Sequence, residues 1–147
     1  MIGLLQRVTE AGVQVAGNSV GTIGPGLLVL VGVEKDDTDA SAERLLERIV
    51  TYRVFSDDSG RMNLDLLETR GGLLLVPQFT LAAETAKGRR PGFSTAASPE
   101  QGRRLFEHLV ALARQRVPKV ETGVFGAHMQ VSLTNDGPVT FWLQSQT

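Results

Sequence analysis

The stretch Val131-Ser-Leu-Thr-Asn-Asp-Gly-Pro-Val-Thr-Phe-Trp-Leu-Gln144 places two strand-like segments on either side of a polar break. The flanking segments alternate apolar and polar residues, which is the period of a half-buried strand. Asn, Asp, Gly and Pro are the usual turn residues, so an ordinary turn at 135–138 is one interpretation. The other is a special backbone site. The bond before Pro138 is an X-Pro bond, the type that supplies nearly all cis peptides in proteins. Gly137 has no side chain and so lets a ligand approach the main chain.

A second stretch, Gly71-Gly-Leu-Leu-Leu-Val-Pro-Gln-Phe-Thr-Leu81, indicates a buried strand that is interrupted. Its short apolar run is bounded by glycines, and Pro77 then places the next residues at a strand end or bulge. Gln78 and Thr80 share one face by period two, while Phe79 points the other way. A strand end with an amide, a hydroxyl and unpaired N–H groups could hold a small polar ligand, although threonine is also common in plain strands.

The remaining periodicity predicts an α/β fold: one mixed-sheet domain over residues 1–147 with two main helices. The first helix, about 40–52, follows the acidic residues at 36–39, and the second runs from an N-cap at Ser98 to about Arg116. Pro99 fits the first helical position, and Gln101 is placed for a capping box. The expected strands are 3–8, 12–16, 27–33, 73–76, 120–125, 129–133 and 139–144, with a loop at 21–26 and a tight turn at 55–61.

Composition narrows the function classes. The chain has 147 residues, is 41% hydrophobic and 21% charged, and contains no cysteine, which excludes disulfides, a thiolate nucleophile and Cys-based zinc sites. No apolar run reaches the ~18 residues of a membrane span, and no signal segment opens the chain, so we expect a cytoplasmic enzyme without membrane contact. A net charge of −1 means that any RNA contact must use a local patch. The basic cluster Lys87-Gly-Arg89-Arg90 is either a solvated loop or such a contact with RNA phosphates.

Other motifs favour neither metal nor cofactor. The glycine-rich segment 21–26 precedes a strand and lacks the Lys-Ser/Thr of a phosphate loop. The segment 57–65 resembles a calcium loop only superficially, because Arg61 occupies a ligand position and no Glu follows at the right distance. No Ser/His/Asp arrangement is visible, and His128 is expected to be structural.

Taken together, Gln78-Phe-Thr-Leu81 and Asn135-Asp-Gly-Pro-Val-Thr140 closely resemble the two signature motifs of the D-aminoacyl-tRNA deacylases. The likeness is collinear and covers nearly the whole chain. It also includes residues 1–9, 26–37, 53–57, 62–64, 90–94 and 129–144. The resemblance implies the fold of that family, a homodimer with no other protein partner, and a reaction: hydrolysis of the ester that joins a D-amino acid to tRNA, releasing both. It also implies hydrolysis of glycyl-tRNA in which glycine has been mischarged onto tRNA-Ala.

The resemblance further implies how handedness is sensed. In the family, the pair corresponding to Gly137-Pro138 is cis and enters the active site of the partner subunit, where its carbonyl oxygens exclude an L side chain. Arg7 resembles the residue that braces the Gly-Pro carbonyl, and Met129 is expected to line the same region.

Two mechanisms remain open for the residues Gln78, Phe79 and Thr80. Either Thr80 acts as nucleophile or polarises the water, or backbone N–H groups around Phe79 and Thr80 hold the oxyanion while the hydroxyl of the substrate assists. We favour the second, because Thr80 has no adjacent base and an unactivated hydroxyl is a poor nucleophile.

Pro77 departs from the family pattern, which usually has serine there, and removes one backbone donor beside the expected oxyanion site. A similar proline occurs in a related deacylase group with relaxed chirality, although Phe79 keeps the usual residue. The alternatives are therefore a deacylase for mischarged L-alanyl- or glycyl-tRNA and a non-catalytic nucleic-acid-binding family member.

Overall fold

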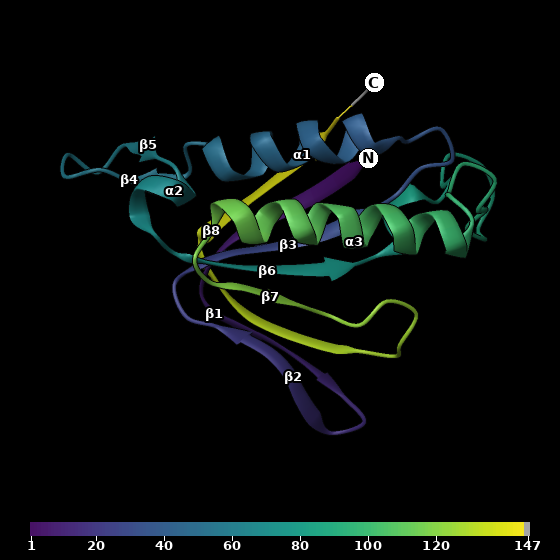
Figure 1. The fold of residues 1–147 in the computed structure, drawn as a ribbon, viewed down its shortest axis with the longest axis horizontal. Coiled ribbons are helices and arrows are strands. Elements are labelled where there is room, and N and C mark those ends of the chain that lie inside the picture. The colour runs from purple at the N-terminus through teal and green to yellow at the C-terminus, as the bar shows by residue number, and fades with distance from the viewer. Residues whose placement is uncertain (146–147) are drawn as a thin grey trace.

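A computed structural model describes residues 1–145 of the chain (Figure 1). The chain forms two long helices, α1 (Asp39–Thr51) and α3 (Pro99–Arg116). It also forms the short helix α2 (Leu66–Thr69) and the 3₁₀ turn η1 (Phe79–Ala82). The strands are β1 (Ile2–Val15), β2 (Asn18–Ile23), β3 (Gly26–Gly32), β4 (Phe55–Ser56), β5 (Met62–Leu64), β6 (Gly72–Pro77), β7 (Val120–Thr122) and β8 (Gln130–Gln144). The prediction of a mixed α/β fold with two main helices is thus confirmed.

The main sheet has the order β2-β1-β3-β6-β7, and β8 also pairs with β1. Its centre is the parallel pair β3 and β6, whose apolar runs are buried on both faces. The two backbones meet very closely where this pair begins. A Cβ atom at Gly26 would lie 2.0 Å from the carbonyl oxygen of Gly72, so only glycine fits there.

Both long helices cover the same face of the sheet, as Figure 1 shows. The larger core lies between them and the sheet and includes Leu5, Leu45, Leu75 and Leu109. A second, smaller cluster lies on the opposite face and includes Val8, Val13, Ile23 and Val76. Among the described residues, no helix covers this second face. Nor is any of the helices in residues 1–145 long and apolar enough to cross a membrane.

The prediction of two separate strands in each terminal region is wrong, because β1 and β8 are each continuous. They pair antiparallel from Ile2 opposite Gln144 to Gln14 opposite Gln130. Gln6 pairs with Thr140 and Val8 with Asn135, so residues 136–139 bulge out opposite Arg7. The polar segment is therefore neither a hairpin turn nor a strand break. It is a wide bulge within one strand.

The side chain of Asn135 replaces the ladder at this bulge. Its Oδ1 accepts from the Val139 N–H at 2.7 Å, and its Nδ2 donates to Thr140 Oγ1 at 2.9 Å. A side chain that satisfies the backbone in this way lets the strand continue past the interruption. An alternation pattern cannot reveal such a substitution, because the bulge changes the phase of the pattern.

Three further expectations need correction. Residues 21–23 form the end of β2 instead of a loop, and β7 stops at Thr122. Ser98 caps α3 as expected, accepting from the Gln101 N–H at 3.2 Å. There is no capping box, because the Gln101 side chain donates to the Asp37 carbonyl.

The expected turn at 55–61 is confirmed as the β4–β5 connection, and the Asp57 carboxylate closes it. The carboxylate accepts from the Ser59 hydroxyl, the backbone N–H groups of Ser59 and Arg61, and the Asn63 amide. These donors, led by the Ser59 hydroxyl, lower the pKa of Asp57 below its ordinary value. This carboxylate is therefore already fully used as a turn-forming group.

Candidate active site

A cavity of about 830 Å³ opens where β6 ends, beside η1 and the first turns of α3. Its walls are mainly apolar and come from four parts of the chain. They include Val31 at the end of β3 and Val33 just after it, Val76 to Phe79 at the end of β6, and, with gaps, residues Phe93 to Phe106 and Phe125 to Val131. Ligand sites are concave and mostly apolar with a few polar groups, so this cavity is the candidate site.

Gln78 and Phe79 are among the residues that line the cavity, and Thr80 follows directly. The segment was expected to continue as an extended strand end, but after Pro77 it turns into η1. Its polar side chains still meet, because the Gln78 amide Nε2 donates a hydrogen bond to Thr80 Oγ1. Within residues 1–145 the backbone N–H groups of Phe79 and Thr80 have no recorded hydrogen-bond acceptor, as is usual for the first N–H groups of a helical turn.

The hydrogen bond from Gln78 decides what the Thr80 hydroxyl can do. A donor to Oγ1 occupies one lone pair and draws electron density from the oxygen. The hydroxyl then becomes a weaker nucleophile and a better hydrogen-bond donor. This arrangement suits a hydroxyl that donates to a developing negative charge.

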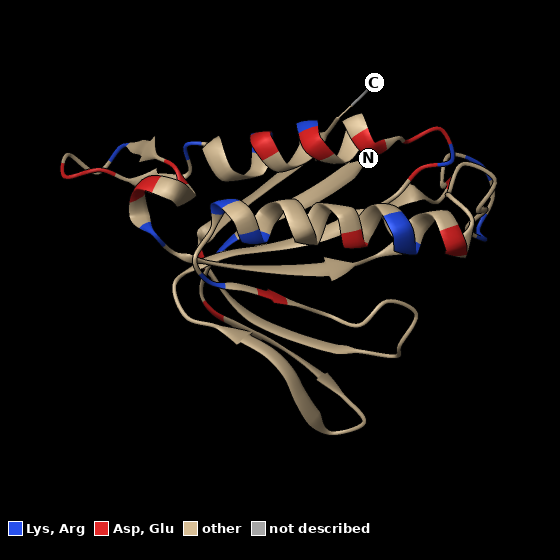
Figure 2. Cartoon of the chain, in the orientation of Figure 1, with Lys and Arg blue, Asp and Glu red and all other residues tan. Residues whose placement is uncertain are grey.

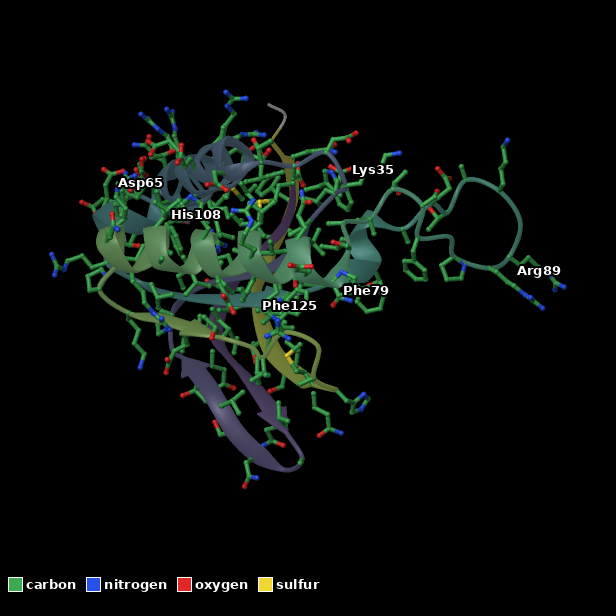
Figure 3. All side chains as sticks on the ribbon, turned by 45° about the vertical axis from the view of Figure 1, so that its right-hand side comes forward. Lys35, Asp65, Phe79, Arg89, His108 and Phe125 are labelled. Atoms are coloured by element: carbon green, nitrogen blue, oxygen red, sulfur yellow. The ribbon has the colours of Figure 1, made fainter. Side chains whose placement is uncertain are left out.

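Aromatic rings form much of the cavity wall. Phe79 is 64% exposed, and its ring lies 5.3 Å, centroid to centroid, from the ring of Phe93. Phe106 and Phe125 contribute further rings from α3 and from the segment after β7. Figure 3 shows Phe79 and Phe125 on the same side of the molecule, near one end of α3. Phe93, Phe106 and Phe125 were not predicted from the sequence, because they are far apart along the chain and isolated aromatic residues usually indicate core.

Met129 and His128 both line the cavity. The Met129 sulfur accepts from the Val124 N–H at 3.3 Å, which fixes the thioether against the preceding segment. Pro77 lines the cavity too, as the last residue of β6.

Gly137 and Pro138 are joined by a cis peptide bond, as expected, but they are not among the described residues that line the cavity of their own chain. Arg7 holds the bulge in place. Its Nε donates to the Asp136 carbonyl at 2.9 Å, and its Nη1 donates to the Val54 carbonyl at 2.6 Å. The carbonyl that Arg7 contacts is thus that of the residue before Gly137.

The basic cluster forms the tip of a loop beyond the cavity. Backbone hydrogen bonds between Glu84 and Gly92 close this loop at its base. Lys87, Arg89 and Arg90 are all exposed around a shallow groove of about 580 Å³. In Figure 3, Arg89 projects away from the body of the molecule, on the side where Phe79 lies. In the described part of the chain, no group of three His, Asp or Glu side chains could hold a metal ion.

The chain is similar to known proteins along nearly its whole length. The family model described as D-Tyr-tRNA(Tyr) deacylase matches residues 4–144. A protein of Thioalkalivibrio sulfidiphilus named D-aminoacyl-tRNA deacylase is 65% identical over 144 residues, which is 98% of this chain and 97% of that protein. A protein of the same name from Ralstonia nicotianae is 62% identical, covering 98% of this chain and 90% of the relative.

Solved structures show the same fold. The structure of a protein named c-Myc DNA Unwinding Element Binding Protein superimposes with a TM-score of 0.95 at 37% identity over all of both chains. Another, of a probable eukaryotic D-amino acid tRNA deacylase, gives a TM-score of 0.81 at 20% identity over 97% of both chains and shows the shared fold. With a matching family model and such relatives, the chain belongs to the D-aminoacyl-tRNA deacylase family.

Proposed function

We propose that this protein hydrolyses the ester of D-aminoacyl-tRNA, releasing free D-amino acid and tRNA. The observation that carries the proposal is the placement of Gln78, Phe79 and Thr80 beside a cavity large enough for an aminoacylated nucleoside. The names of the relatives point to the same activity. We further propose that the enzyme acts in the cytoplasm.

The direct test compares D-tyrosyl-, L-tyrosyl- and glycyl-tRNA as substrates. We expect rapid release of D-tyrosine, release of glycine from tRNA-Ala, and no release of L-tyrosine above the uncatalysed rate. Rapid turnover of mischarged L-alanyl-tRNA would instead support a deacylase with relaxed chirality. A proline at the position of Pro77 occurs in a related group of that kind. The absence of turnover with every charged tRNA would refute the proposal.

In the proposed reaction, water attacks the carbonyl carbon of the ester and the ribose oxygen leaves. The negative charge on the carbonyl oxygen is held by the N–H groups of Phe79 and Thr80 together with the Thr80 hydroxyl. The neighbouring hydroxyl of the ribose assists proton transfer. The aminoacyl ester is intrinsically reactive, so positioning and oxyanion stabilisation can supply much of the rate.

Thr80→Ala is expected to lower kcat by about ten- to a hundredfold, the cost of losing one hydrogen bond to a charged oxygen. Loss of a true nucleophile would cost on the order of a millionfold. Thr80→Ser should retain most activity. Single-turnover kinetics with D-tyrosyl-tRNA measures both effects.

Gln78 provides a check on this assignment. If its amide acts by polarising the Thr80 hydroxyl, then Gln78→Ala lowers kcat in the wild-type background but adds little to Thr80→Ala. Additive losses in the double variant would show that Gln78 acts on the substrate independently of Thr80.

We propose that a second copy of the chain covers the sheet face opposite the helices. Residues 11–33, which include β2, contain no Lys, Arg, Asp or Glu, and the lower half of Figure 2 is nearly free of charge. Leu133 and Trp142 of β8 are 37% and 53% exposed. They lie opposite Ala11 and Leu4 of β1, and paired residues share a face. Large apolar side chains without charges are typical of the centre of a protein interface.

The same interface would carry the Gly137-Pro138 bulge into the site of the partner. Both residues are exposed and lie outside the cavity of their own chain, so they are available to another copy. A rigid main chain beside the α-carbon would exclude an L side chain while tolerating many D side chains. In this proposal Arg7 sets the position of the bulge through Asp136, and Met129 lines the completed pocket.

We propose that Lys87, Arg89 and Arg90 contact RNA phosphates. Neutralising them (Lys87→Gln, Arg89→Gln, Arg90→Gln) is expected to raise KM for D-aminoacyl-tRNA but not for a D-aminoacyl-adenosine. The slope of log KM against log salt should fall by about 0.7–0.9 for each phosphate that no longer has a cationic partner. The exposed Arg114, on α3, offers a charge-matched control for each single substitution, and an equal effect of Arg114→Gln would mean that only overall charge matters.

The non-catalytic alternative retains one supporting observation, since the 37% identical structure is that of a protein named for binding a DNA unwinding element. The net charge of −1 provides little attraction for duplex DNA. DNA binding by this chain without hydrolysis of any charged tRNA would favour that function.

A further inference from the structure

The ring of Phe125 stands on a tight turn at the cavity wall. The Ala127 N–H donates to the Val124 carbonyl at 3.2 Å, which closes a four-residue turn with Phe125 at its second position. Gly126, at the third position, has φ +80°, a conformation that favours glycine. The turn therefore presents Phe125 as a fixed projection toward the cavity.

The edge of this ring rests directly on the backbone of α3. A Cβ atom built at Gly102 would lie 3.2 Å from Phe125 Cζ and 3.5 Å from Cε2. The Gly102 N–H makes the ordinary first helical bond to the Ser98 carbonyl at 2.8 Å, and glycine is unfavourable within a helix compared with alanine. The helix itself does not need a glycine here. The ring of Phe125 needs it, because a side chain at this position would push the ring away.

The face of the same ring is covered by a cation. The guanidinium carbon of Arg103 lies 4.9 Å from the centroid of the Phe125 ring, which is within the range of a cation–π contact. In the described part of the chain, Arg103 has no carboxylate partner. Its clearest contact is with the ring.

The other side of the turn is held by Met129. A Cβ atom at Gly123 would lie 2.7 Å from the Met129 sulfur, and the same sulfur accepts from the Val124 N–H. The turn that carries Phe125 is thus fixed by α3 on one side and by Met129, the residue before β8, on the other.

We propose that Gly102 and Arg103 are positioning residues that set where the Phe125 ring stands in the cavity. They thereby control how tightly the enzyme holds the part of the substrate that lies against this ring. This inference rests on the proposed function. The residues proposed to act on the ester, Gln78 to Thr80, belong to a different segment, so the device should govern binding and leave the chemical step unchanged.

The test measures KM and kcat for D-tyrosyl-tRNA in single variants. Arg103→Gln is expected to raise KM by about two- to fivefold, the value of an exposed cation–π contact, with kcat within about twofold. Arg103→Lys should restore KM. Gly102→Ala should also raise KM, without lowering the melting temperature, because the methyl group displaces the ring while alanine favours the helix. Arg104→Gln is the matched control: Arg104 pairs with Asp39 at 2.7 Å, and its loss should leave KM unchanged.

The double variant decides whether Arg103 acts through the ring. In a Phe125→Leu background, Arg103→Gln should have no further effect on KM. A persistent, salt-dependent rise in KM in that background would overturn the proposal, because Arg103 would then contact the RNA itself. A fall in kcat with unchanged KM would overturn it as well.

A readout without substrate separates this inference from the proposed function. The chain has three methionines, and ¹³C-methyl labelling gives a signal for Met129, which contacts the turn. Arg103→Gln and Gly102→Ala are expected to shift this signal, whereas Arg104→Gln should not. An unmoved signal in both variants would refute the positioning role, whatever the enzyme hydrolyses. Shifted signals in a protein that hydrolyses no D-aminoacyl-tRNA would refute only the proposed function.

Discussion

Leu133→Glu is expected to yield a folded monomer with kcat/KM at least about a hundredfold below that of the wild type. The residue lies on the uncharged face that we assign to the interface between two copies. Each protomer would bury one unpaired carboxylate there at a cost of about 3–5 kcal/mol, which raises the dimer dissociation constant by at least roughly two to four orders of magnitude. Light scattering, circular dichroism and hydrolysis of D-tyrosyl-tRNA measure assembly, folding and turnover in turn.

Met62→Glu offers a matched control for this experiment. Met62 is also a large, exposed apolar residue, but it belongs to the separate β4–β5 sheet. The control variant should remain dimeric and active. A monomeric Leu133→Glu protein with full activity would show that each chain contains a complete site.

Gly137→Ala is expected to lower kcat/KM for D-substrates by more than about tenfold, with a stability loss of about 1–3 kcal/mol. Gly137 has φ +146°, and an added Cβ would lie 2.6 Å from Val139 Cγ2 and 2.9 Å from the Val139 nitrogen. The bulge must shift to accept the methyl group, which moves the carbonyl groups proposed to meet the substrate. Hydrolysis assays with thermal unfolding distinguish the two losses.

Gly17→Ala separates backbone strain from function. Gly17 also has a positive φ, +80°, but an added Cβ would meet no atom within 4 Å. This variant should lose stability with unchanged kinetics. If Gly137→Ala behaves in the same way, the bulge has no part in the reaction.

The sequence was sufficient for those parts of the fold in which local chemistry and burial agree. The apolar run of β3 and the caps of α1 and α3 lie within one or two residues of their expected positions. The failures in the two terminal strands share one cause. In β1 and β8 the bulges reverse the alternation, and the hydrogen bonds of Asn135 replace a ladder that only the fold can reveal.

The candidate site, too, was predictable from the sequence only in part. Gln78 to Thr80 were recognised as a motif, yet their conversion from strand to 3₁₀ turn depends on packing after Pro77. Phe125 could not be connected with the site from sequence, because its neighbours Gly102 and Arg103 approach it from a helix more than twenty residues earlier. Gly102 offered the one available signal, a glycine inside a helix pattern.

The pairing of β1 with β8 has a consequence for synthesis. Ile2 pairs with Gln144, so β1 leaves the ribosome first and β8 last. One edge of β1 therefore has no hydrogen-bond partners until β8 has been synthesised. Contacts so distant in sequence close slowly, and an unpaired strand edge can recruit other chains meanwhile. Nascent or truncated chains that lack residues 130–144 should therefore aggregate more readily than the complete folded chain and should depend more on chaperones.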